Sequence, residues 1–295
     1  LRVAYIFRRV DVIHALDVYP FGIIAWIVGI LLRKPFFLSA QGTYSIAPLH
    51  RRWFGFFARW ACRSARRIIS ISRYTASLLL ASVPDAQVVV IPHGINVDAY
   101  RVSSDQKSRA LQVLSVGALK WRKGYHIALE AFARVVTRVP SARYVVVGSQ
   151  RDVGYTARLR SLAESLGIMS SVEFIEGCTQ DELRRLYASS RVFVLPSLNQ
   201  GWHFEGFGLV FLEAAASGLP VIGTLGNGIA DAVDDGRNGF LVPQGDIEAT
   251  AVATEKLLCD DELWMRMSSH SIAWANEHSV DGMMQEYKKV YDSIL

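Results

Sequence analysis

Cysteine is scarce in this sequence of 295 residues, and its three copies are widely spaced. Cys62, Cys178 and Cys259 include no CxxC pair. A disulfide framework needs an even set of cysteines, and a cysteine-based zinc site needs closely spaced ligands. The pattern therefore argues against both and fits a reducing compartment, the cytoplasm. Histidines at metal-ligand spacing are also missing, so we expect no metal site.

Long hydrophobic runs are missing as well. The longest apolar run, Phe21 to Leu32, spans 12 residues, whereas a helix that crosses a bilayer needs about 20. We expect this run to form a buried helix. No signal-peptide pattern precedes it, and the chain opens on Leu1 instead of Met, so we expect the natural amino terminus to lie further upstream.

Acidic residues are rare in the first third of the chain. Residues 1–100 contain twelve Lys and Arg, four Asp and no Glu, a surplus of eight positive charges. The whole chain carries +5, so the remaining 195 residues carry −3. This asymmetry argues against a uniform nucleic-acid coat, and we expect no nucleic-acid partner. It favours one face that meets an anionic partner.

Short apolar runs alternate with helix-period segments in the second part of the chain. After a polar stretch at 101–109, interpreted as a linker, strands are expected at 112–116, 144–147, 172–175, 191–195 and 220–223. Helices are expected at 125–139, 156–166, from 179 with a capping box, and at 208–217,. Continuous apolar strands between helices are typical of a parallel sheet covered on both faces. We predict a doubly wound domain at 107–278.

The first domain, 1–106, has the same α/β texture. Strands are expected at 10–15, 35–39, 67–71 and 88–91. A doubly wound domain normally opens with a strand and a phosphate-facing turn, and too few residues precede Asp11 to form them. We therefore predict an incomplete first domain. Residues 279–295 are expected to form a helix that packs back toward it.

The segment from Glu205 to Glu213 carries the strongest chemical signal. Gly206 and Gly208 lie just ahead of a predicted helix, whose first amides and dipole can hold a phosphate. Glu213 lies in an apolar run, where a carboxylate needs hydrogen-bond donors, and ribose hydroxyls would supply them. The alternative is a plain helix N-terminus near Glu205, with Glu213 paired to a structural arginine.

Three cations follow the predicted strand at 112–116. Lys120, Arg122 and Lys123 precede Gly124 and a helix, at the end of a strand where doubly wound sheets bind ligands. They are placed to neutralise a diphosphate. The alternative is a solvated, charged surface.

Together these motifs resemble glycosyltransferase family 4, retaining enzymes with the GT-B fold, in which two Rossmann-like domains face a cleft. The matching segments are 116–125, 195–197, 205–209, 213–222 and 238–243 in the second domain, and 11–14, 69–72 and 91–96 in the first. The family's opening strand and glycine-rich turn are not in this sequence. The family usually has arginine where Ala118 stands, and many members have His-Gly where Gln41-Gly42 stands.

The resemblance implies roles for individual residues. Lys123 would contact the donor diphosphate, Glu205 and the backbone of 206–208 would hold the donor sugar, and Glu213 would bind the ribose. The implied donor-binding set is Gly117, Lys120, Arg122, Lys123, Ile175, Gly177, Glu205, Gly206, Phe207, Gly208, Leu209 and Glu213, with the base near 175–177. Gln41 and Gly42 are assigned to the acceptor side. Glu205, Lys123 and, from its place at a strand end, His14 are the catalytic candidates.

The implied activity moves a sugar from a nucleotide-diphosphate donor to a saccharide or lipid-linked acceptor, in cell-surface polysaccharide or glycolipid synthesis. Family members retain anomeric configuration without a metal, commonly explained by front-face attack. No cofactor is expected, because the nucleotide sugar is a substrate. Two alternatives stay open. One is a truncated, catalytically silent chain that only binds nucleotide. The other is a dinucleotide-dependent oxidoreductase, suggested by Gly223 to Gly228, whose glycine spacing is the reverse of GxGxxG.

The segment Arg51 to Arg67 holds six arginines and no acidic residue. Trp53, Phe57, Trp60 and Ala61 fall on one helical stripe. The pattern fits a helix in an anionic membrane interface, at the inner face of the cell membrane. An amphipathic helix packed on its own sheet would give the same stripe.

Overall fold

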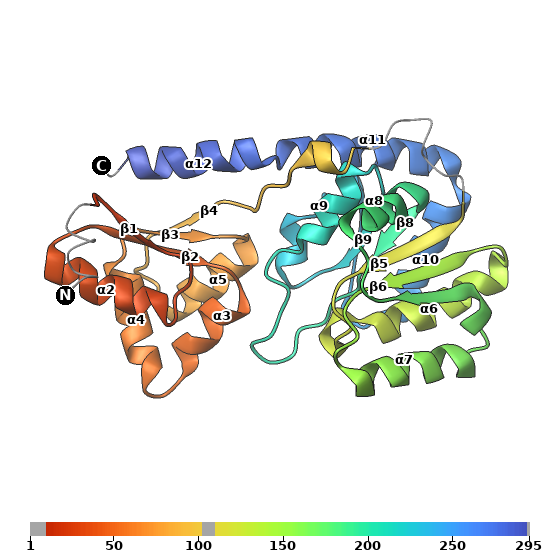
Figure 1. Ribbon diagram of the computed structural model, residues 1–295, viewed down its shortest axis with the longest axis horizontal. Coiled ribbons are helices and arrows are strands. Elements are labelled where there is room, and N and C mark those ends of the chain that lie inside the picture. The colour runs from red at the N-terminus through yellow and green to blue at the C-terminus, as the bar shows by residue number, and fades with distance from the viewer. Residues whose placement is uncertain (1–9, 102–109, 294–295) are drawn as a thin grey trace. The chain divides into compact units, whose positions relative to one another are not determined.

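The computed structural model describes residues 10–101 and 110–293, and it divides the chain into two units (Figure 1). Unit 1 comprises the residues up to Gly94, the segment Gly201–Phe207 and the residues from Val280 on. Unit 2 comprises Ile95–Gln200 and Gly208–Ser279. The boundary expected between residues 106 and 107, and most of the predicted linker, lie outside the described residues.

Unit 1 is built on a parallel sheet of four strands, in the order β1-β2-β3-β4. The strands, coloured red to orange in Figure 1, are β1 (Ile13–Ala15), β2 (Phe36–Ala40), β3 (Arg67–Ser70) and β4 (Val88–Val90). All four lie in predicted positions. Every residue of β2 is buried, as expected for a strand covered on both faces,. The α-helices are α2 (Phe21–Leu32), α3 (Thr43–Ile46), α4 (Phe54–Ser64), α5 (Arg73–Ser82) and α12 (Val280–Asp292), and η1 (Ala47–His50) and η2 (Val97–Ala99, in unit 2) are 3-10 turns.

Helix α2 has the predicted bounds, but the prediction that it is buried is wrong. Its buried residues are the small ones, Gly22, Ala25 and Gly29. A Cβ on Gly29 would lie 3.1 Å from both the Lys34 carbonyl oxygen and the Phe36 ring, so the helix packs too closely for a larger side chain there. Ile23, Trp26 and Val28 are half-buried against the core, and the other five large apolar side chains from Phe21 to Leu31 are exposed.

Unit 2 is built on a parallel sheet of six strands, in the order β10-β9-β8-β5-β6-β7. The strands are β5 (Gln112–Val116), β6 (Arg143–Val147), β7 (Val172–Ile175), β8 (Val192–Val194), β9 (Val221–Thr224) and β10 (Gly239–Val242). The first five agree with prediction to within one or two residues, and β10 was not predicted. β10 lies within 238–243, one of the segments that resemble the family.

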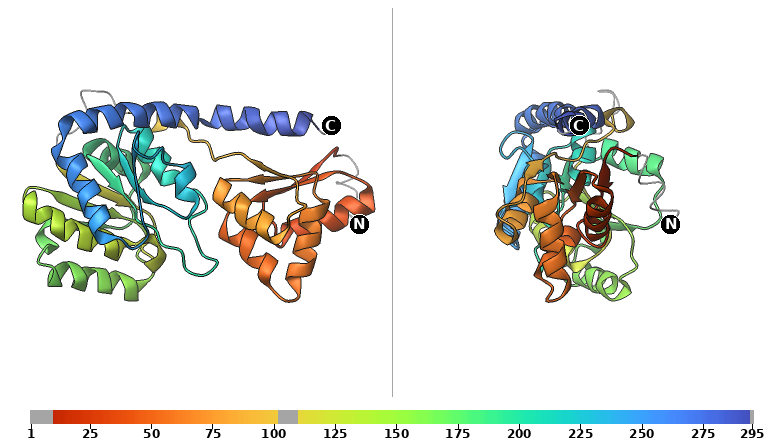
Figure 2. Two further views of the ribbon diagram at one scale, coloured as in Figure 1. Left: turned by 180° about the vertical axis from the view of Figure 1, so that it is seen from behind. Right: turned by 90° about the vertical axis from the view of Figure 1, so that its left-hand side faces the viewer.

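The helices of unit 2 cover both faces of its sheet. They are α6 (Tyr125–Arg138), α7 (Val153–Ser165), α8 (Gln180–Ser189), α9 (Leu209–Ala216), α10 (Ile247–Cys259) and α11 (Asp261–Glu277), with 3-10 turns at η4 (Trp121–Lys123), η5 (Met169–Ser171) and η6 (Gly228–Asp231). The strand order runs one way from β5 to β7 and the other way from β8 to β10. Right-handed crossovers therefore place α6 and α7 on one face of the sheet and α8 and α9 on the other,. Figure 2 shows the ribbon from behind.

The capping box predicted at the start of α8 is confirmed. The Thr179 amide donates to the Glu182 carboxylate at 2.8 Å, and the Glu182 amide donates to the Thr179 hydroxyl at 3.3 Å. Over the described residues, no helix is long and apolar enough to cross a membrane.

Candidate functional site

The strand order of unit 2 reverses between the neighbouring strands β5 and β8. Ligands of open parallel sheets bind at the carboxyl ends of the strands beside such a reversal. At this edge the chain leaves β5 through 117–123 and, after β8, enters α9 at Leu209. The sheet topology thus brings two of the predicted donor-binding segments to one place.

Close backbone packing fixes the carboxyl ends of β5, β6 and β7. The Gly117 amide donates to the Val147 carbonyl at 2.9 Å, and the Gly148 amide donates to the Ile175 carbonyl at 3.0 Å. A Cβ on Gly148 would lie 1.8 Å from the Gly117 carbonyl oxygen, so only glycine fits there. Gly177 has φ +73° and open space around its Cα. Gly117, Ile175 and Gly177 therefore share the edge, as predicted.

The cation cluster lies on the turn η4, directly after this edge. The ammonium of Lys123 lies 4.0 Å from the place that a Cβ on Gly117 would take, so it sits at the end of β5. The hydroxyl of Tyr125 donates to the Gly117 carbonyl at 2.5 Å and ties the turn to the strand. Lys120 is exposed and Arg122 is half-buried.

Gly124 explains why two sequence motifs come together. It has φ +73°, and a Cβ there would lie 1.9 Å from the carbonyl oxygen of Pro196. The segment 116–125 therefore packs directly on the segment 195–197 that follows β8. The sequence analysis named 195–197 only as a segment that matches the family, so this contact was not predicted.

Glu213 lies on α9, whose N-cap residue Gly208 has φ +94°. The first amides of a helix have no intrahelical acceptor and point outward from its start, so the amide of Leu209 is available to an anion. The Tyr187 hydroxyl donates to Glu213 Oε2 at 2.8 Å, and the Tyr100 hydroxyl donates to the same carboxylate. Burial raises the pKa of Glu213, and the two tyrosine hydrogen bonds oppose the rise.

These tyrosines replace the arginine considered as the alternative partner of Glu213: within the described part of the chain, the hydrogen-bond donors that the carboxylate has are hydroxyls. The sequence prediction missed both. Tyr187 could have been found from the sequence, because a tyrosine at a buried helical position needs a partner for its hydroxyl. Tyr100 could not, since it lies after a 3-10 turn and far from Glu213 in sequence.

The other predicted donor residues belong to unit 1. Glu205, Gly206 and Phe207 are part of its segment 201–207, whereas Gly208 begins the next stretch of unit 2. A Cβ on Gly206 would lie 3.0 Å from the Gln41 carbonyl oxygen. Within unit 1, Gly206 thus lies against the predicted acceptor-side residues Gln41 and Gly42.

Gly42 and Thr43 hold this contact. Gly42 has φ +100°, and a Cβ there would lie 3.0 Å from the Cα of Gly206. The Thr43 hydroxyl accepts from the Phe204 amide at 3.1 Å and donates to the Phe204 carbonyl at 3.2 Å. Phe207 is buried, with its ring 6.1 Å from that of His93.

His14 lies on β1, and both of its ring nitrogens have partners. Nδ1 is 2.6 Å from the Tyr291 hydroxyl, and Nε2 is 3.0 Å from the Ser39 hydroxyl. Burial lowers the pKa of His14. The ring therefore joins β1 and β2 to α12, and its catalytic role stays a prediction of the sequence.

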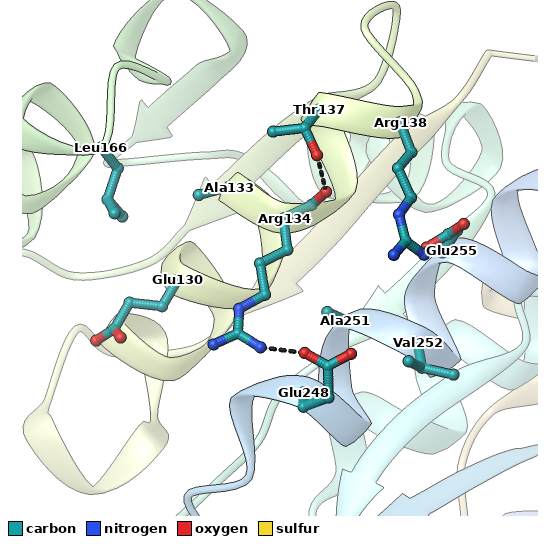
Figure 3. A pocket seen from close by; sticks show the side chains of 10 residues that line it. All are labelled: Glu130, Ala133, Arg134, Thr137, Arg138, Leu166, Glu248, Ala251, Val252 and Glu255. Carbon is teal, nitrogen blue, oxygen red and sulfur yellow. Dashed lines mark hydrogen bonds and ion pairs between the residues drawn. The ribbon is translucent and has the colours of Figure 1, made fainter.

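Two other features lie apart from this site. A hollow of about 440 Å³ between α6 and α10 is bordered by the ion pairs Arg134–Glu248 and Arg138–Glu255, the second at 2.8 Å (Figure 3). Both of its arginines are paired with glutamates, Glu130 is a third carboxylate on its wall, and it contains no predicted site residue. In the run 223–228, a Cβ on Gly223 would lie 2.4 Å from Ile229, so that glycine serves close packing. Within residues 10–101 and 110–293, no group of acidic, histidine and cysteine side chains is arranged to hold a metal.

Family profiles match the chain along nearly its whole length. The profile described as "Glycosyl transferases group 1" matches residues 96–274, and the one described as "Glycosyltransferase Family 4" matches residues 1–99. The D-inositol 3-phosphate glycosyltransferase of Corynebacterium jeikeium is 33% identical over 220 residues, which cover 70% of this chain and 51% of that protein. This chain thus spans about half the length of that relative.

A longer match reaches the GDP-mannose-dependent alpha-(1-6)-phosphatidylinositol monomannoside mannosyltransferase of Mycobacterium tuberculosis. It is 28% identical over 287 residues, covering 90% of this chain and 73% of that protein. Among solved structures, HepE of Anabaena in complex with UDP has a TM-score of 0.88 at 21% identity, covering 99% of this chain and 81% of that one. Sucrose-phosphate synthase of Thermosynechococcus elongatus has a TM-score of 0.78 at 22% identity, covering 96% and 73%. These likenesses concern the fold and confirm the predicted GT-B class.

Proposed function

Since this chain belongs to the glycosyl transferases group 1, family 4, we propose that it transfers a sugar from a nucleotide-diphosphate donor to a saccharide or lipid-linked acceptor, with retention of anomeric configuration. The observation that carries this proposal is the edge of the unit 2 sheet where the strand order reverses. There Lys123 lies beside Gly117, and α9 presents its first amides and carries Glu213.

The chemistry of that edge suits a nucleoside diphosphate. The ammonium of Lys123, supported by Lys120 and Arg122, would neutralise the diphosphate as charge builds on it during bond cleavage. The amides that open α9 would hold phosphate or sugar oxygens. Glu213 would accept hydrogen bonds from the ribose hydroxyls, and the backbone at 175–177 would border the base.

The protein would act by positioning and charge stabilisation. In the front-face reaction, the glycosidic bond to the phosphate breaks as the acceptor oxygen attacks the same face of the sugar, and the leaving phosphate takes the acceptor proton. No protein nucleophile is needed, and the proposed reaction uses no metal. Glu205 is next in sequence to Gly206, which packs against the Gln41 carbonyl, and it would orient the donor sugar.

A lipid-linked acceptor is the finer part of the proposal. The mannosyltransferase of Mycobacterium tuberculosis is named for a phosphatidylinositol monomannoside, and the basic, acid-free segment 51–67 of this chain is suited to an anionic lipid surface,. Work in the cytoplasm, at the inner face of the cell membrane, would follow. The three cysteines are unpaired thiols, as a reducing compartment requires.

Calorimetric titration with UDP and with GDP tests the donor site. We expect Glu213→Ala to weaken binding of the preferred diphosphate by about 1–3 kcal/mol, because the ribose hydroxyls lose a partly buried partner. Glu164→Ala, on the exposed side of α7, is the matched control and should bind normally. Normal binding by folded Glu213→Ala would contradict the proposed role of Glu213.

The same titration tests the two alternative functions. Binding of NAD in place of the diphosphates would support an oxidoreductase, and diphosphate binding without transfer to any acceptor would support the catalytically silent alternative.

A further inference from the structure

Helix α4 of unit 1 places its large and small side chains in an unusual way. The residues that it buries are Gly55, Ala58, Ala61 and Cys62. A Cβ on Gly55 would lie 2.6 Å from the Leu49 carbonyl oxygen, so this side approaches its neighbours too closely for a large side chain. The predicted stripe therefore loses Ala61, which lies on the buried side.

The opposite side of α4 is aromatic and exposed. Trp53 is 83% exposed, and Phe54, Phe56, Phe57 and Trp60 are 43–54% exposed. A helix that only packs on its sheet buries its large apolar residues and exposes polar ones. This helix does the reverse, so packing on its own sheet does not explain the stripe.

Helix α2 repeats the arrangement. Its glycines and alanine face the sheet, as described above, while Phe21, Ile24, Ile27, Ile30 and Leu31 are 46–75% exposed. Two adjacent helices of one unit thus expose nine large apolar side chains between them, and Trp53, which precedes α4, is a tenth. Exposed apolar surface of this extent marks an interaction site.

The two helices lie side by side and point the same way. Near their amino ends, the rings of Tyr19 and Phe54 are 5.5 Å apart. At their carboxyl ends, Ile30 of α2 and Ser64 of α4 line one hollow of about 380 Å³. We call the exposed side chains of these two adjacent helices the α2–α4 face; Figure 1 labels both helices.

The positive charge around the α2–α4 face indicates an anionic partner. From Val18 to Pro84 the sequence contains nine Lys and Arg and no Asp or Glu. The hollow at the helix ends is lined by the cations Arg33, Lys34 and Arg66 and by no acidic side chain. Arg52 and Arg63 are exposed, and at helical spacing they fall on a row beside the aromatic stripe,.

We propose that the α2–α4 face docks unit 1 on an anionic phospholipid bilayer, with its aromatic and aliphatic side chains in the interface and its arginines on the lipid phosphates. Tryptophan and phenylalanine flanked by arginine are suited to that boundary, because the rings enter the acyl region while the cations stay at the headgroups. The membrane contact predicted for residues 51–67 extends in this way to α2, and the hollow receives headgroups. Docking is independent of sugar transfer, so it is tested without measuring transfer.

Co-sedimentation with vesicles tests the charge. The purified protein should bind vesicles of phosphatidylcholine mixed with phosphatidylglycerol, bind phosphatidylcholine vesicles weakly, and detach as salt is added. The double variant Arg63→Glu/Arg66→Glu should bind the anionic vesicles at least about tenfold more weakly. Arg158→Glu/Arg266→Glu, at exposed positions of unit 2, changes net charge equally and should bind like the unmodified chain.

A second pair of variants tests the apolar contact. Trp53→Ser/Phe57→Ser should weaken binding to anionic vesicles and lower the quenching of tryptophan fluorescence by brominated acyl chains. Leu225→Ser/Met265→Ser removes two exposed apolar side chains of unit 2 and should change neither. Unchanged thermal unfolding shows that each variant is folded.

Three outcomes overturn the proposal. One is equal binding to neutral and anionic vesicles, and another is equal loss of binding in both charge-reversal variants. The third is a dimer in sedimentation velocity that Trp53→Ser/Phe57→Ser dissociates while vesicles do not bind, which would make the face an interface between copies of this chain.

Discussion

Glu213 is a carboxylate whose two neighbouring hydroxyls set its properties. Tyr187 is fully buried and donates to Oε2 at 2.8 Å. A carboxylate that accepts from two tyrosine hydroxyls keeps a defined orientation. Burial alone would favour the protonated acid, which would be a weaker acceptor,.

Tyr187→Phe removes one of these donors and should raise the pKa of Glu213 further. We expect diphosphate binding to weaken by about 1 kcal/mol at neutral pH, with a larger loss at acidic pH, where more of the variant is protonated. Calorimetric titration across this pH range measures both effects. Tyr74→Phe, on α5 of unit 1, serves as control, and a pH profile parallel to that of the unmodified protein would contradict the orienting role of Tyr187.

Gly124 is a residue where backbone conformation and space both require glycine. Gly124→Ala should lower the free energy of unfolding by more than about 1–2 kcal/mol, because the left-handed conformation alone costs that much and the new Cβ meets the Pro196 carbonyl oxygen. Gly167→Ala is a matched control, with φ +69° and nothing within 4 Å of the Cβ position. Urea unfolding of both should give the larger loss at Gly124, and equal losses would show that the Pro196 contact relaxes.

The start of α8 offers a test at the scale of one element. Thr179→Ala removes the cap hydroxyl and should lower the free energy of unfolding by about 1 kcal/mol. Thr179→Ser keeps the hydroxyl and should restore most of it. Urea unfolding followed by circular dichroism measures the difference, and equal destabilisation by both would mean that the Thr179 methyl group, not the cap, matters.

Elements were predicted well from the sequence where a local pattern specifies them. The strands of unit 2 are continuous apolar runs ended by glycine, such as 112–116, and local composition suffices to find them. The buried side of α2 could not be predicted, because nearly all of its residues are apolar. The buried side of α2 is the side with the smallest residues, because the helix packs so closely there that only Gly22 and Gly29 fit at the contact. β10 was missed, although α10 follows it closely, because its run of four residues is too short for a periodic pattern to show.

The candidate site was predictable only in part for a similar reason. Motif spacing proposed Lys123, Glu205 and Glu213 as site residues, and their roles stay predictions. The contacts that place them are long-range, such as Gly124 on Pro196 and Tyr100 on Glu213. No local pattern encodes those contacts, so the sequence identified the residues and the fold supplied their surroundings.

At the scale of the whole molecule, charge and chain path are related. The surplus of eight positive charges in residues 1–100 falls largely in unit 1. The chain returns to that unit twice, at 201–207 and from Val280 on. The first return brings Gly206 against Gln41-Gly42, and the second brings Tyr291 to His14. Unit 1 therefore combines a basic surface with segments that come from distant parts of the sequence.

Buried histidines in both units make overall stability depend on pH. Burial lowers the pKa of His14 and His93 in unit 1 and of His126 in unit 2 below the ordinary value of 6.5. Between the lowered and ordinary values the unfolded chain binds more protons than the folded one, so the free energy of unfolding falls as pH drops below 6.5. The carboxyls of Asp17 and Glu213, whose pKa burial raises, act in the opposite direction, because the folded chain binds more protons there than the unfolded one. Urea unfolding at about pH 7.5 and about pH 5.5 should show the loss, and His126→Gln should reduce it. His203→Gln, at an exposed position, should leave the slope unchanged, and a stability that rises on acidification through this range would refute the expectation.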